Sequence, residues 1–133
     1  MFLSPKQECF SINRMSSRIE TNISVNWHHQ VLFTKDVFNA ENPILHDALK
    51  REAQATARKT LIVVDEALSK AQPTLTAQIK AYFKTHADVL DLVCDPIIME
   101  GGERTKNSYF HVSEIHSHLD RYHIDRHSYL ICV

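Results

Sequence analysis

The hydrophobic pattern changes along the chain from a period of two to helical spacing. From Ile23 to Trp27 apolar and polar residues alternate, which predicts a strand, and Gln30–Val37 continues as a second short strand or a bent extension of the first. Asn42-Pro43 then combines an N-cap residue with a proline at the first helical position. Leucine and alanine recur every four residues from there, so we expect an amphipathic helix ending near Arg58-Lys59.

The rest of the chain alternates between strand and helix patterns. Thr60–Asp65 is an apolar run with polar ends, which is typical of a strand buried on both faces. A helix is expected to open at Gln72-Pro73, with an apolar stripe formed by Leu75, Ile79, Phe83 and His86 and with Tyr82 beside it. A short strand in Val89–Cys94 and an exit loop over Pro96–Met99 follow. The last expected elements are a helix over Thr105–Tyr122 and a buried strand over Ser128–Val133. This order favours an α/β, Rossmann-like fold: a mostly parallel sheet with helices on both faces and the N-terminal strands at its edge.

The length of 133 residues suits one domain. Residues 1–18 show no period and are interpreted as a mobile leader, and residues 19–133 as the α/β domain. The chain stops directly after the apolar strand that ends in Ile131-Cys132-Val133. We therefore expect it to be the front part of a longer protein, so that the fold is truncated.

Charge and composition exclude several classes of protein. Fifteen basic and sixteen acidic residues give a net charge of −1, without the basic excess typical of nucleic-acid binding. No apolar run approaches the roughly 18 residues of a membrane span, and the N-terminus lacks the features of a signal peptide. The three cysteines are far apart and lack CxxC spacing, which favours a reduced, cytoplasmic compartment.

Three candidate binding positions follow strands: Asp65-Glu66, the Met99–Asn107 segment, and the carboxyl end of the last strand after Ile131-Cys132-Val133. Asp65 ends the most apolar strand, where a carboxylate can accept hydrogen bonds from both hydroxyls of a ribose; the alternative is a helix cap. Gly101-Gly102, the only glycines of the chain, follow the next strand, and glycine permits a positive φ and a close approach to a ligand. Glu103 can bind sugar hydroxyls, and Lys106 can reach the same side; the alternative is a glycine turn with a capping glutamate.

Histidines are numerous, but their spacing does not indicate a metal site. Five of the nine crowd the last predicted helix and the turn after it: His111, His116, His118, His123 and His127. The HExxH and HxxEH patterns are absent, although His111 and His118 are spaced to share a helix face. We therefore expect a solvated histidine face, and we assign no catalytic residue and no metal ligand from the sequence.

Three segments in order resemble the N-terminal, NAD-binding part of 3-dehydroquinate synthase and its sugar phosphate cyclase relatives. They are Leu61-Ile62-Val63-Val64-Asp65, Gly102-Glu103-Arg104-Thr105-Lys106-Asn107 and Asp125-Arg126-His127-Ser128-Tyr129-Leu130-Ile131. The resemblance covers roughly residues 23–133. It implies cofactor contacts by Asp65, Gly102, Glu103 and Lys106, with Asp65 on the adenosine ribose and the Glu103–Lys106 pair on the NAD side. Many family members have Asn at the position of Ala67, so a branch acting on another sugar phosphate, such as a heptulose phosphate, is also open.

The resemblance implies a cytoplasmic lyase that eliminates phosphate from a sugar phosphate and closes a carbocycle, with transient use of NAD. It also implies a divalent metal, zinc or cobalt, whose ligands belong to a helical C-terminal domain outside this sequence. We expect the 133-residue chain alone to be inactive and to self-associate, as a homodimer or through an exposed sheet face. Two alternatives stay open: the NAD-binding domain of a metal-dependent alcohol or glycerol dehydrogenase, and a non-catalytic α/β interaction domain.

Overall fold

The computed structural model describes residues 21–26, 28–51 and 56–133, so the predicted leader lies outside the described residues. The chain divides into two units, Met1–Val31 and Leu32–Val133. In the first unit, residues 21–26 and 28–31 are exposed and have no regular secondary structure. The second unit contains every helix and strand described below, beginning with α1 (Ile44–Leu49).

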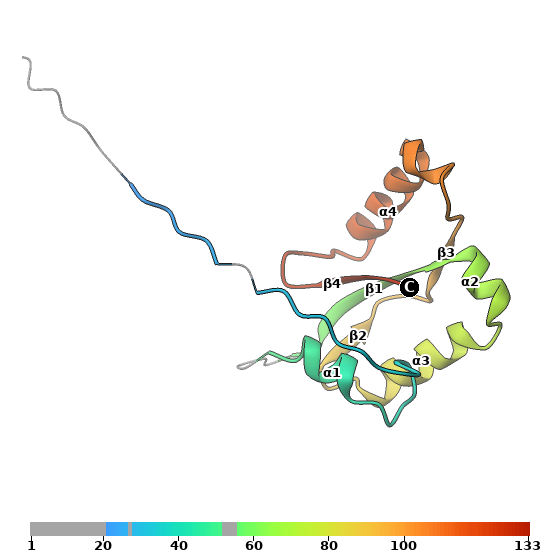
Figure 1. Cartoon of the computed structure of the whole chain (residues 1–133), viewed down its shortest axis with the longest axis horizontal. Helices are drawn as coiled ribbons and strands as arrows, with labels where there is room; N and C mark the ends of the chain where they lie inside the picture. Colours follow the sequence, from blue (N-terminus) through green and yellow to red (C-terminus); the bar gives the residue numbers. More distant parts are fainter. Residues whose placement is uncertain (1–20, 27, 52–55) are drawn as a thin grey trace, which may run out of the picture. The chain divides into compact units, whose positions relative to one another are not determined.

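A parallel sheet forms the centre of the second unit (Figure 1). Its strands are β1 (Arg58–Asp65), β2 (Leu90–Leu92), β3 (Ile97–Met99) and β4 (Tyr129–Cys132), and the last three all pair with β1. Thr60 pairs with both Leu92 and Tyr129, and Val63 pairs with both Ile97 and Cys132. Since a strand has two edges, β2 and β3 follow each other along one edge of β1, and β4 lies along the other.

The two crossovers run in opposite directions across the sheet. The first runs through α2 (Glu66–Ala71) and α3 (Leu75–Thr85) to β2, and the second runs from β3 through a short 3₁₀ helix, η1 (Thr105–Asn107), and α4 (Tyr109–Arg121) to β4. Right-handed crossovers in opposite directions place their helices on opposite faces of the sheet. Figure 1 accordingly shows α3 and α4 on either side of β1 and β4.

The main core lies between the sheet and α3. Ile62 and Val64 on β1 pack with Leu75, Ile79, Tyr82 and Phe83 of α3, which are all buried, together with Phe38, Val89 and Leu90. Each large aliphatic side chain buried in this way contributes roughly 1.5–3 kcal/mol relative to exposure. The predicted stripe of α3 is therefore confirmed, and so is the prediction that β1 is buried on both faces, because Leu61 on its other face is also fully buried.

The predicted N-terminal edge strands are wrong over the described residues. Residues 21–26 and 28–36 contain no strand and are exposed; Trp27 lies outside the described residues. An alternating pattern only specifies which face a strand would bury, and it forms a strand only when a neighbouring strand supplies hydrogen bonds. The sheet thus lacks the N-terminal edge strands that the pattern predicts.

Several element boundaries also differ from the prediction. The first helix ends at Leu49, because Lys50 is extended, and β1 already begins at Arg58. The six-residue helix α2 was not predicted. The segment expected as an exit loop contains β3, and the predicted helix over Thr105–Tyr122 is divided by Ser108, whose backbone is extended.

The last strand was expected to be buried, but it is partly buried on one face and exposed on the other. The Leu130 side chain is 45% exposed and Cys132 is exposed, whereas Tyr129 and Ile131 pack against the core. The outer edge of β4 has no partner strand among the described residues. No helix in the described part of the chain combines the length and the apolar character needed to cross a membrane.

Candidate functional site

The carboxyl ends of the strands bring the predicted positions to one edge of the sheet. Asp65 is in register with Met99, which is two residues before Gly101. On the other side of β1, the Asp65 amide donates a hydrogen bond to the Val133 carbonyl at 2.8 Å. The three places that the sequence indicated, at the ends of β1, β3 and β4, are therefore neighbours at what we call the carboxyl edge.

Asp65 is the N-cap of α2. Its Oδ1 atom accepts hydrogen bonds from the amides of Ala67, at 2.8 Å, and Leu68, at 3.1 Å. The capping alternative is thus realised, because these amides begin a helix and have no partner within it. The second carboxylate oxygen, Oδ2, accepts no hydrogen bond from the described residues and lies against Gly101.

Gly101 and Gly102 are each required for a different structural reason. An ideal Cβ on Gly101 would lie 1.7 Å from Asp65 Oδ2, so this position accepts only glycine while the carboxylate keeps its place. Gly102 has a φ of +92°, a conformation that L side chains rarely adopt. The close approach expected at the glycine pair is therefore made by Gly101, toward Asp65.

Glu103 and Lys106 form an ion pair at 2.5 Å between Oε1 and Nζ, and both side chains are largely exposed. Glu103 lies in the turn and Lys106 in η1, which ends just before the extended Ser108, so the glycine pair does not lead directly into the α-helix as expected. An exposed ion pair contributes roughly 0.2–1 kcal/mol, so a ligand that needs either charge can displace it.

The Asp125-Arg126-His127-Ser128 segment forms the turn that enters β4. Asp125 Oδ1 accepts hydrogen bonds from the Ser128 hydroxyl and the His127 amide, both at 2.8 Å. The Ser128 hydroxyl bond, followed by the His127 amide bond, lowers the pKa of the Asp125 carboxyl below its ordinary value. The spacing of Asp and Ser in this motif therefore has a local structural cause at the amino end of the strand.

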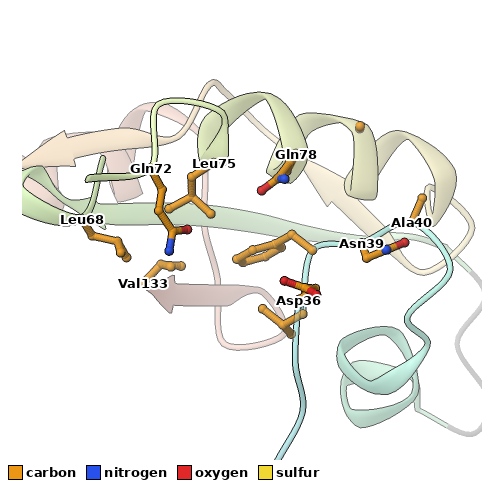
Figure 2. A pocket seen from close by; sticks show the side chains of 11 residues that line it. Asp36, Asn39, Ala40, Leu68, Gln72, Leu75, Gln78 and Val133 are labelled. Carbon is orange, nitrogen blue, oxygen red and sulfur yellow. The ribbon is translucent and has the colours of Figure 1, made fainter. Parts of the chain in front are cut away.

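A cavity of about 730 Å³ that the sequence did not predict lies on the core face, next to the carboxyl edge. Its wall combines a loop, residues 36–40, with Leu68 of α2, Gln72, three residues of α3 (Leu75, Gln78 and Ala81) and Val133. Figure 2 shows the Gln72 side chain reaching from the end of α2 toward Val133. No local pattern could have revealed this cavity, because the segments that form it are joined only by the tertiary fold.

A second cluster lies near the amino ends of the strands. His46 of α1, His86 at the end of α3 and Asp88 have possible metal-ligand atoms that all lie within 4.8 Å of one another. It is the one such group of histidine, cysteine and acidic side chains found among the described residues, and it includes none of the histidines of α4. The sequence analysis missed it because forty residues separate His46 from His86.

Comparison with known families, characterised proteins and solved structures found no significant similarity to this chain. The structure itself establishes a mixed α/β fold with a parallel sheet.

Proposed function

We propose that this chain is the NAD-binding, Rossmann-like part of a sugar phosphate cyclase that resembles 3-dehydroquinate synthase. The observation that carries the proposal is the meeting of Asp65, the Gly101-Gly102 turn and Val133 at the carboxyl edge. In open α/β sheets, ligands bind beyond the carboxyl ends of the strands. A binding site at this edge would therefore include the cofactor residues that the resemblance implies.

The side chains at this edge suit the sugar part of a dinucleotide. Asp65 is held in place by the α2 amides through Oδ1, so its Oδ2 atom is a fixed acceptor for a ribose hydroxyl. Gly102 and the exposed Glu103–Lys106 pair belong to the turn that follows Gly101, the glycine against Asp65. Glu103 would accept from hydroxyl groups, and Lys106 would offer a positive charge to the cofactor.

In the proposed enzyme, NAD would transiently accept a hydride from a carbon of the sugar phosphate that bears a hydroxyl group. The residues of this chain would bind and orient the cofactor through Asp65, Gly102, Glu103 and Lys106. The proposal places the divalent metal and the phosphate-binding groups in a helical domain outside this sequence. An enzyme that contains this chain should release inorganic phosphate from a seven-carbon sugar phosphate, and failure with heptulose and heptulosonate phosphates would count against the cyclase.

Nuclear magnetic resonance of the ¹⁵N-labelled chain tests the binding site directly. We expect millimolar NAD to shift the amide signals of Ala67, Gly101, Gly102 and Val133, with ADP-ribose reproducing the effect near Asp65. Asp65→Asn retains a good helix cap but removes the negative charge, so it should abolish these shifts while the protein stays folded.

Asp91→Asn is the matched control, since it changes an exposed carboxyl on β2 at the other end of the strands. This variant should respond to NAD like the wild type. The proposal fails if NAD shifts no signal at the carboxyl edge, or if Asp65→Asn leaves the shifts unchanged.

A further inference from the structure

His46, His86 and Asp88 come from two helices and the turn that precedes β2, yet their side chains meet. We propose that they bind a divalent metal ion, best suited to Zn²⁺, that fastens α1 to the end of α3 (Figure 1). The cluster is independent of the proposed cofactor site. It adds a metal site to this chain, whichever function the carboxyl edge has.

The distances require only small side-chain movements to reach metal coordination. His46 Nε2 and Asp88 Oδ2 are 3.4 Å apart, and the imidazole rings of His46 and His86 are 5.0 Å apart between centroids. Ligand atoms about 2.0–2.2 Å from a tetrahedral Zn²⁺ are separated by roughly 3.3–3.5 Å. The His46–Asp88 pair already has this separation, and the His86 ligand atom lies within 4.8 Å of both.

Each imidazole already has a hydrogen bond that orients its other nitrogen. His46 Nδ1 lies 2.8 Å from Asp47 Oδ1, and a carboxylate only accepts, so this nitrogen donates. His86 Nε2 lies 3.1 Å from the Ala40 carbonyl and donates for the same reason. Carboxylate and carbonyl partners of this kind are typical outer contacts of metal-bound histidines.

His46 Nε2 and His86 Nδ1 are therefore the nitrogens that could bind a metal ion. His46 Nε2 lies 3.4 Å from Asp88 Oδ2, which as a carboxylate oxygen accepts, so a metal ion between the two atoms would take the place of the proton that they share. Two nitrogens and one carboxylate oxygen form a ligand set that suits zinc. Asp88 is exposed, which leaves room for water as a fourth ligand.

The surroundings of the cluster connect it to the core. Tyr82 is fully buried, and its hydroxyl accepts from the His46 amide at 3.0 Å while its ring lies 4.3 Å from that of His86. Asp88 lies just before β2, near Arg58, whose amide bonds to the Val89 carbonyl at the amino end of β1. The cluster is therefore at the opposite end of β1 from Asp65.

The test uses the full 133-residue chain, freed of metal with a chelator, at neutral pH. Zn²⁺ should bind with one ion per chain by calorimetry and raise the melting temperature, because an ion that binds only the folded state stabilises it. Co²⁺ should give the strong visible absorption of a tetrahedral site. Long-range ¹H–¹⁵N spectra should show Zn²⁺ shifting His46 Nε2 and His86 Nδ1.

Asp88→Asn removes an exposed ligand, and we expect it to weaken Zn²⁺ binding by roughly tenfold or more. Asp91→Asn and His116→Ala, two changes at exposed positions, should bind Zn²⁺ like the wild type. The proposal is overturned if Zn²⁺ does not bind, if Asp88→Asn binds as tightly as Asp91→Asn, or if the ion shifts the imidazoles of α4 instead. Circular dichroism checks that Asp88→Asn is folded, so that weaker Zn²⁺ binding can be attributed to the lost ligand and not to unfolding.

Discussion

At the scale of single residues, Asp65 and Gly101 depend on each other. The Asp65 carboxylate uses one oxygen to cap α2 and turns the other toward Gly101, where it occupies the space of a side chain. The glycine at this position is therefore explained by a contact within the protein. If NAD binds at Oδ2, Gly101 also determines where that acceptor lies.

Gly101→Ala should displace the Asp65 side chain and weaken the cap of α2, at a cost of about 0.5–2 kcal/mol in unfolding free energy. Urea unfolding of Gly101→Ala, Asp65→Ala and the double variant measures this effect. We expect the glycine change to cost much less when Asp65 is already alanine, because the clash is then gone. An equal cost in both backgrounds would show that another contact is responsible.

At the scale of elements, Tyr82 joins α3 to the start of α1. Its hydroxyl donates to the Asn42 carbonyl and accepts from the His46 amide, both at 3.0 Å, and its ring is completely buried. Burial raises the pKa of the Tyr82 phenol, so the hydroxyl keeps its proton for the bond to Asn42. A helix of six residues is not stable by itself, so α1 depends on such contacts.

Tyr82→Phe keeps the ring but leaves the partly buried His46 amide and Asn42 carbonyl without their partner. We expect it to destabilise the fold by about 1–3 kcal/mol in urea unfolding. Tyr109→Phe is the matched control, since Tyr109 is 75% exposed on α4 and should change stability by less than about 0.5 kcal/mol. Equal stability of the two variants would mean that the Tyr82 hydroxyl does not fasten α1.

At the scale of the whole molecule, the β4 side of the sheet is incompletely covered. Leu130 and Cys132 are exposed on β4, and Tyr109, Phe110 and Val112 are exposed on α4. A strand edge without a partner and exposed apolar side chains favour association with another surface. We therefore expect the 133-residue chain to self-associate.

Sedimentation velocity in a reducing buffer should show a sedimentation coefficient that rises with protein concentration. Leu130→Lys should lower the degree of association, because it places a charge on the exposed face of β4. Ala77→Lys, an exposed change on α3, is the control for the added charge and should have no effect. Monomeric behaviour of the wild type at every concentration would contradict the prediction.

The longest hydrophobic patterns were the most reliable predictors of structure. The apolar run of β1 and the stripe of α3 were predicted because their periods reflect burial of the same residues in the core. The N-terminal strands failed because alternation cannot show whether a partner strand exists. The division of the last helix at Ser108 and the short α2 were missed because weak local signals mark such boundaries.

The sequence by itself determined the order of the main strands and helices, the parallel sheet and the positions of Asp65 and the glycine turn after strands. Only the tertiary structure showed that Asp65 and Gly101 touch, that a cavity adjoins Val133 and that His46, His86 and Asp88 meet. The physical reason is distance along the chain. Periodicity records which side of an element is buried, whereas contacts between residues tens of positions apart exist only after the elements have packed.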